Sequence, residues 1–97
     1  MKRVRFHPAA DDELLAATDW YVDRSLTAAT AFLREVAHAI TRISEAPQLY
    51  PRTRVRDHRR FVMFRYPFDI VYRVLTDEIE IVAVAHHARR PGYWRHR

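Results

Sequence analysis

Residues 61–87 read FVMFRYPFDIVYRVLTDEIEIVAVAHH, and the alternation within this stretch decides the fold class. Apolar side chains occupy every second position from Phe68 to Val74 and again from Ile79 to Ala85. A short polar connection, 76–78, joins the two stretches. Alternation of this kind indicates strands that bury one of their faces. Together with the apolar run 61–64, it predicts three successive strands in an antiparallel meander, with a further short edge strand at 54–56 left open.

The half of the chain before this stretch carries a helical period. A short strand is expected at 4–6, and Pro8 then stands where a first helix begins, because proline suits the first helical position. Ser25 is expected to cap a second helix, and Pro47 to end it. The second helix carries an amphipathic stripe of Ala29, Phe32, Val36, Ile40 and Ile43. The two helices are predicted to form an antiparallel hairpin.

The element order β-α-α-β-β-β predicts an α+β fold. The N-terminal strand and the helical hairpin are expected to pack on a mainly antiparallel sheet, with Trp20, Tyr21 and Phe32 in the core of the hairpin. The opposite face of the sheet would then carry arginine and histidine side chains and be open to solvent or to a partner. A chain of 97 residues has the length of one domain, so 1–97 is expected to fold as a single unit.

Charge is unevenly distributed along the chain. The formal net charge is +5, yet residues 1–48 hold six basic and seven acidic side chains, whereas residues 49–97 hold eleven and five. Every basic residue except Lys2 is arginine, whose planar guanidinium suits phosphate and carboxylate partners. The basic second half predicts an acidic partner, either nucleic acid or an acidic protein segment. Separate, solvated arginines are the alternative.

Several classes of protein are excluded or disfavoured by composition. With no cysteine, thiol catalysis and zinc–thiolate sites are impossible, and the single glycine, Gly92, rules out glycine-rich phosphate loops. The charged start predicts neither a secretory signal nor a membrane span, which favours the cytoplasm. His86 and His87 are adjacent on a strand and should point to opposite faces, so no metal site and no cofactor is expected.

Nearly the whole chain resembles toxins of the RelE/ParE superfamily from type II toxin–antitoxin systems, on the ParE-like branch. The most specific piece is the ending His86–Trp94, which fits the pattern H-x-x-R-x-P-x-Y-W. The other pieces of the resemblance are residues 4–10, 19–21, Phe32 with 40–43, 47–51, 59–61 and 66–74.

The resemblance implies one of two mechanisms. ParE-like toxins trap DNA gyrase on cleaved DNA and so block replication and growth, whereas RelE-like toxins cut mRNA on the ribosome. Both are neutralised by an antitoxin in a hetero-oligomer. Such pairs serve either in plasmid stabilisation or in a chromosomal stress response, and the sequence leaves both roles open. We expect a gyrase inhibitor that is not itself an enzyme, with the ribosome-dependent ribonuclease as the alternative. A degenerate, non-toxic binding module is a third possibility.

The residues expected of a RelE-like ribonuclease are only partly present. Such an enzyme needs groups that transfer protons and cations that stabilise the phosphate. By resemblance, Arg60 stands at one strand lysine position, but the second falls on Val62 and a strand arginine falls on Asp69. His87 replaces the late arginine, and Tyr93 is the one direct counterpart. The catalytic candidates under this alternative are His87, Tyr93 and Arg60.

A set of basic and aromatic residues is expected to bind the target or the antitoxin. The arginines could gather into one patch where strand ends meet, and the two aromatic residues near the terminus could either cap the core or present a contact. The set consists of Arg59, Arg60, Arg65, Arg89, Arg90, Tyr93 and Trp94.

Overall fold

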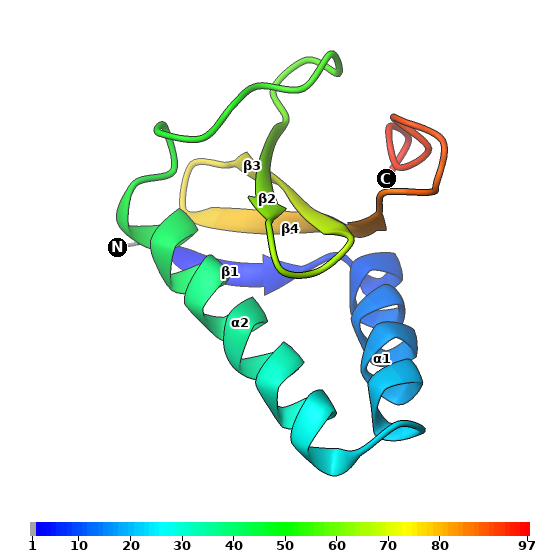
Figure 1. The fold of residues 1–97 in the computed structure, drawn as a ribbon. Coiled ribbons are helices and arrows are strands. Elements are labelled where there is room, and N and C mark those ends of the chain that lie inside the picture. Colours follow the sequence, from blue (N-terminus) through cyan, green and yellow to red (C-terminus); the bar gives the residue numbers. More distant parts are fainter. Residues whose placement is uncertain (1) are drawn as a thin grey trace.

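The computed structural model describes residues 2–97, and its elements follow the predicted order (Figure 1). The elements are β1 (Arg3–Phe6), α1 (Pro8–Val22), α2 (Leu26–Glu45), β2 (Arg59–Met63), β3 (Phe68–Val74) and β4 (Glu78–His86). The strands form one four-stranded sheet in the order β1-β4-β3-β2, so the α+β prediction is confirmed. Within residues 2–97, no helix combines the length and the apolar character needed to cross a membrane.

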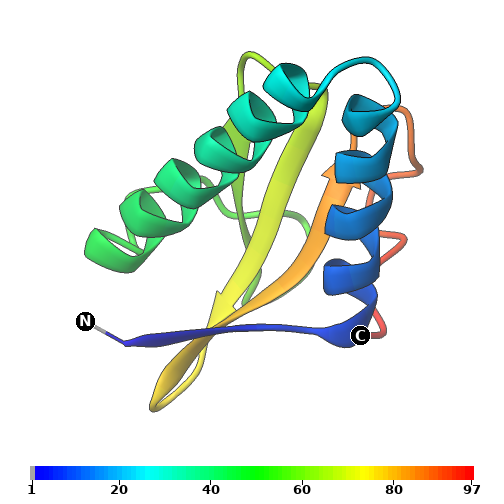
Figure 2. The ribbon, with the colours of Figure 1, turned by 90° about the horizontal axis from the view of Figure 1, so that it is seen from below.

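Both helices begin at a side chain that accepts a hydrogen bond from a free backbone amide. His7 Nδ1 accepts from Ala9 N at 3.0 Å, and Pro8 follows at the first helical position. Ser25 Oγ accepts from Ala28 N at 3.0 Å, as its predicted capping role requires. The short connection between the helices turns the chain back, and the predicted hairpin is confirmed (Figure 2).

The sheet combines the predicted meander with a parallel first strand. β3 lies between β2 and β4 and pairs antiparallel with both, so that Phe61, Ile70 and Val84 stand side by side. β1 pairs parallel with β4, with Val4 opposite Ile79. Both helices cover the same face of the sheet, called here the helix face (Figure 2).

The main core lies between the hairpin and the helix face. Phe32 of α2 is fully buried there with Ile70, Tyr72 and Ile81 of the sheet. Burying a side chain of this size stabilises a fold by about 1.5–3 kcal/mol. Tyr72 Oη donates a hydrogen bond to Pro47 O at 2.6 Å, which ties the segment after α2 to the centre of the sheet.

A β-bulge in β4 breaks the alternation predicted for this strand. The register steps from Tyr72 opposite Ile81 to Val71 opposite Ala83, so Val82 has no partner of its own in β3. Sequence alternation placed Ile81 and Ala83 on the same face. The extra residue instead moves Ala83 to the face opposite the helices.

That opposite face, called here the tail face, is covered at its centre. Residues 87–97, the tail, fold back so that Trp94 is only 5% exposed and packs against Val71, Val82 and Ala85. The prediction of an open face is therefore wrong for this central area. The physical reason is that the bulge and the valines beside it put apolar side chains on this face. Burying them under the tail removes this apolar surface from water. Val55 from the loop before β2 adds to it.

Two local predictions also need correction. Residues 54–56 form no strand, and the loop contains only an isolated bridge between Arg52 and Arg59. Asp57 turns this loop with a φ of 64°, a left-handed conformation that aspartate tolerates better than most residues.

The second prediction to correct is the core position of Trp20, because this residue does not lie in the core. Its side chain is 52% exposed, whereas Phe32 is buried and stacks on the ring of Tyr21 with centroids 4.8 Å apart. Ala17 and Tyr21 lie on the side of α1 that faces the core. The helical period places Trp20 on the flank of the helix, outside the core.

Candidate functional site

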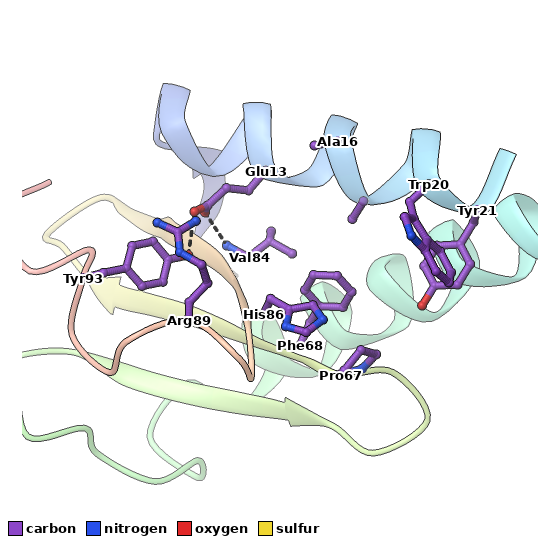
Figure 3. Close-up of a pocket in the computed structure, with 11 residues that line it drawn as sticks. Glu13, Ala16, Trp20, Tyr21, Pro67, Phe68, Val84, His86, Arg89 and Tyr93 are labelled. Carbon is purple, nitrogen blue, oxygen red and sulfur yellow. Dashed lines mark hydrogen bonds between the residues drawn. The ribbon is translucent and has the colours of Figure 1, made fainter. Parts of the chain in front are cut away.

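A cavity of about 410 Å³ opens between α1 and the last residues of β4 (Figure 3). Its walls are mostly apolar, and Trp20 and Tyr21 of α1 lie at one end. Glu13, Tyr93 and Arg89 lie at the other end (Figure 3). The first helix, the edge of the sheet and the C-terminal tail therefore all line the cavity.

The cavity lies where β4 has no strand on its outer side. β1 accompanies β4 only as far as Phe6 opposite Ile81, and His7 N adds one more bond to Ile81 O at 2.8 Å. Pro8 then starts α1 and takes the chain away from the sheet. β4 runs on to His86, so the rest of its outer edge faces side chains of α1 and the tail.

One carboxylate, Glu13, occupies the first part of this edge. Its Oε1 accepts from Val84 N at 3.0 Å and from Arg97 Nη1 at 2.8 Å. Its Oε2 accepts from Arg97 Nη2 at 2.9 Å and from Tyr93 Oη at 2.5 Å. Arg97 also donates to Val82 O at 3.0 Å. The two side chains therefore satisfy backbone groups that a neighbouring strand would otherwise bond.

These contacts shift the pKa values of the cluster. Burial raises the pKa of Glu13, but hydrogen bonds from Arg97 and Tyr93 outweigh it and hold that pKa below its ordinary value. Burial and the bond to Glu13 raise the pKa of Tyr93 far above its usual range. The bond to Glu13 also raises the pKa of Arg97. At neutral pH, Glu13 is therefore ionised and Tyr93 is a neutral donor committed to it.

A second polar cluster lies on the tail face beside the end of β4. His87 Nε2 is 2.9 Å from Asp69 Oδ1, and Arg60 Nη1 is 4.0 Å from Asp69 Oδ2. His87 N donates to Pro67 O at 2.8 Å, which holds the histidine in line with β3. Asp69 stood out in the sequence only as a charge of the wrong sign. In the structure it orients an imidazole, an arrangement that suits a general base.

The two adjacent histidines point in opposite directions, as strand geometry predicts. His86 lies edge-on to the ring of Phe68, with centroids 5.1 Å apart, and lines the cavity on the helix side. His87 turns to Asp69 on the tail face. No cluster of three or more metal-ligating side chains occurs within residues 2–97.

Two of the predicted binding arginines are engaged on the helix side of the sheet. Arg59 donates to Tyr50 O at 2.7 Å and to Gln48 Oε1 at 3.1 Å, which anchors the loop that follows α2. Arg65, in the turn after β2, lies 3.5 Å from Glu35 and remains exposed. Arg59 thus has a structural role, and Arg65 keeps most of its surface free.

The remaining arginines sit at the start of the tail. Arg89 lies over the ring of Tyr93, 3.9 Å from its centroid, and Arg90 is exposed. Because Met63, Phe68 and His86 are aligned across the sheet, the turn that carries Arg65 lies at this same end. Arg59 is four residues before Met63 along β2, which places it about 13 Å from this end of the sheet. The expected patch therefore divides, and Arg59 lies apart from it.

The two aromatic residues of the tail have different environments. Trp94 is buried against the tail face of the sheet, and its ring lies tilted beside that of His58, with centroids 5.1 Å apart. Tyr93 is half-buried at the cavity, with its hydroxyl on Glu13. Both contribute to packing. Glu13 lies in the first turns of α1, where a negative charge suits the helix dipole, and no local pattern indicates its partner 84 residues away.

The hairpin also presents large apolar side chains to solvent. The apolar stripe predicted for the second helix consists of positions that face the core, so it gives no sign of these side chains. Leu15 and Val22 are seven residues apart on α1, and Leu26 and Leu33 are seven apart on α2, so each pair shares one side of its helix. An exposed apolar set of this kind marks an interaction surface more often than a lone residue does.

Comparison with known proteins identifies the family. Residues 4–91 match the family model described as ParE toxin of type II toxin-antitoxin system, parDE. No curated protein matches the chain. A solved structure titled "Chromosomal ParDE TA system from P. aeruginosa" is similar with a TM-score of 0.65 and 24% identity. The match covers 89% of this chain and 96% of that one, and at this identity it supports the fold alone.

Proposed function

Because the chain belongs to the ParE family of toxins of type II toxin–antitoxin systems, we propose that it is a cytoplasmic inhibitor of DNA gyrase. It binds gyrase and holds it on cleaved DNA without performing any cleavage itself. A toxin of such a system has an antitoxin partner, and binding of that antitoxin prevents contact with the target.

The bond between Tyr93 and Glu13 is the observation that favours a binding protein over a ribonuclease. A ribonuclease built from His87, Arg60 and Tyr93 needs all three groups around one phosphate. The hydroxyl of Tyr93 is committed to Glu13 at the outer edge of β4, and its pKa is raised. His87 and Arg60 meet Asp69 on the tail face instead. This division argues against a shared catalytic centre.

The exposed side chains of the chain suit both proposed partners, gyrase and the antitoxin. The exposed arginines at the sheet end that carries Arg65, Arg89 and Arg90 suit acidic residues of gyrase or of the antitoxin, or the DNA that gyrase holds. The exposed apolar side chains of the hairpin suit an apolar segment of the antitoxin. A toxin–antitoxin hetero-oligomer would cover both surfaces.

A gyrase reaction tests this function directly. Purified protein is added to gyrase, plasmid and ATP, and both supercoiling and linear DNA are scored against toxin dose. We expect supercoiling to fall and linear DNA to rise, and the cognate antitoxin to reverse both effects. His87→Ala is the matched variant and should behave like the natural chain. Unchanged supercoiling at a large molar excess of folded protein would reject the proposal.

The contact between His87 and Asp69 favours one alternative, cleavage of mRNA on the ribosome. The carboxylate fixes Nε2 of the imidazole and leaves Nδ1 free to accept a proton, while Arg60 supplies a nearby cation. Primer extension on ribosome-bound mRNA distinguishes the two functions. New cuts that disappear in His87→Ala would support the ribonuclease, and no cuts with intact gyrase inhibition would exclude it.

A further inference from the structure

The loop at residues 51–58 and the tail form one surface on the side of the sheet away from the helices (Figure 1). Val55 of the loop packs against the cluster that Trp94 covers, and the ring of His58 lies 5.1 Å from the ring of Trp94. These contacts hold the two segments together, although three strands separate them in the sequence.

The loop and the tail carry most of the positive charge of the molecule. The loop contains three arginines and one aspartate, and the tail contains four arginines and no acid. Their formal charges, +2 and +4, together exceed the +5 of the whole chain, so the remaining residues are slightly acidic in sum. α1, on the helix face, contains four acids and no basic residue. This asymmetry would turn the tail face toward a polyanion.

Four exposed arginines from the loop, β2 and the tail form what is called here the basic face: Arg54, Arg56, Arg60 and Arg95. Within residues 2–97, neither Arg54 nor Arg95 forms an ion pair. Arg56 meets only Asp57, at 3.9 Å, and both of these side chains are almost fully exposed. The guanidiniums of this face are therefore largely free to bind an anion.

One of these cations is held in place by the single glycine of the chain. Arg95 Nε donates to Gly92 O at 3.1 Å. The guanidinium packs so closely on Gly92 that a Cβ at this position would come within 2.7 Å of Arg95 Nη2. Gly92 also has a φ of 75°, a conformation that suits glycine. Arg95 is thus exposed and yet fixed in direction.

The composition of the basic face favours a nucleic-acid duplex as its occupant. None of the large exposed apolar side chains of residues 2–97 belongs to the loop or the tail, and Trp94 is buried. A protein partner would need apolar or aromatic anchors at the centre of its interface. A single strand would need an exposed aromatic ring on which its bases stack. The phosphates of a duplex need only cations and hydrogen-bond donors, which arginine supplies.

We propose that the basic face binds the phosphate backbone of duplex DNA directly and without reading its sequence. The guanidiniums donate hydrogen bonds to phosphate oxygens, and condensed counterions leave the DNA as the chain binds. This inference goes beyond gyrase inhibition, because the contact needs no gyrase. It would place the chain on the DNA that the proposed target holds.

Fluorescence anisotropy of a short labelled DNA duplex, titrated with the chain in the absence of gyrase and antitoxin, measures this binding. We expect the logarithm of the affinity to fall with the logarithm of the salt concentration with a slope of about −3, because each phosphate contact releases roughly 0.9 of a counterion. Duplexes of unrelated sequence should bind alike, within about twofold. Absence of binding at low salt, or an affinity that does not change with salt, would overturn the proposal.

A matched pair of double variants locates the contact. Arg54→Ala, Arg95→Ala should lower the affinity for the duplex at least about tenfold and reduce the salt slope by about 2. Arg34→Ala, Arg42→Ala removes the same charge from the exposed side of α2 and should stay within about twofold of the natural chain. Thermal unfolding midpoints should be nearly unchanged in both, since exposed charges contribute little to stability. Equal affinities in the two variants would overturn the proposal.

The same titration separates DNA from other nucleic acids and this inference from the proposed function. Tighter binding to duplex RNA or to a single strand than to duplex DNA would overturn the assignment to DNA. Gyrase is absent from these measurements, so failure of the chain to inhibit gyrase would leave the DNA result standing. Intact gyrase inhibition without any binding to the duplex would reject the basic face alone.

Discussion

Tyr93 Oη donates a hydrogen bond to Glu13 Oε2 at 2.5 Å and joins two positions 80 residues apart. Arg97 binds both oxygens of the same carboxylate. The first helix and the end of the chain are thereby fixed together along the outer edge of β4. This contact holds the tail on the sheet and removes the Tyr93 hydroxyl from any role on the tail face.

Glu13→Gln should destabilise the fold by loosening the tail. The amide keeps one acceptor but loses the ion pair with Arg97, whose side chain is only 18% exposed. Lost hydrogen bonds to charged groups predict a cost of about 1.5–3 kcal/mol in the free energy of unfolding. Urea unfolding followed by circular dichroism measures it. Asp12→Asn, an exposed acid on the same helix, is the control, and an equal effect in both variants would refute the role of the ion pair.

Stability should fall in acid because of the same carboxylate. The pKa of Glu13 is lower in the folded chain than its ordinary value of 4.5, and Glu80, which binds Arg73 and Arg5, is shifted the same way. A lowered folded pKa gives stability that is present above the ordinary value and is lost as pH falls through the folded value. The free energy of unfolding should therefore decline below about pH 4.5.

Glu13→Gln also provides the control for this pH dependence. The variant should show a shallower decline in acid than the natural chain, since one of the two shifted groups is gone. Parallel curves for the two proteins would show that Glu13 does not contribute to the acid sensitivity.

Trp94→Ala should cost far more stability than Trp20→Ala. Trp94 is 5% exposed beneath the sheet, and truncating a buried tryptophan costs about 3–5 kcal/mol. Trp20 is 52% exposed, so its truncation removes much less buried surface. Thermal or urea unfolding of both variants compares them directly. Similar losses would mean that the tail does not pack on the sheet in solution.

The double substitution Arg89→Ala, Arg90→Ala should weaken antitoxin binding or toxicity while the midpoint of thermal unfolding stays nearly unchanged. Arg90 is exposed and Arg89 contacts only the face of Tyr93, and exposed charges contribute little to stability. Arg34→Ala, Arg42→Ala removes the same charge from the exposed side of α2 and serves as the control. A large loss of stability would assign the tail arginines to the fold.

His87→Ala should leave growth inhibition by the chain intact if gyrase is the target. His87 pairs with Asp69 on the tail face, and a binding protein needs no proton transfer there. Colony counts after induction of each variant, without antitoxin, measure the effect. Loss of toxicity in His87→Ala, but not in the matched His86→Ala, would instead support the ribonuclease.

Local sequence was sufficient to predict most of the architecture. Pro8 and Ser25 mark both helix starts, the apolar stripe of α2 marks its buried side, and the alternation in β3 marks a strand. These signals are local, because each depends on backbone geometry and on neighbours within a few residues. The family resemblance rested on the same ordered pieces and is confirmed for residues 4–91.

Only the tertiary structure could show how the edge of β4 is completed. One extra residue at Val82 changes which face Ala83 joins, and no local pattern distinguishes a bulge from regular alternation. Glu13 and Arg97 are ordinary surface charges in the sequence, and only the fold places them on neighbouring backbone groups of β4, Val84 N and Val82 O. Sequence periodicity thus determined which segments become helices and strands. Long-range packing decided which edge stays open, because that depends on where β1 stops and on where the tail returns.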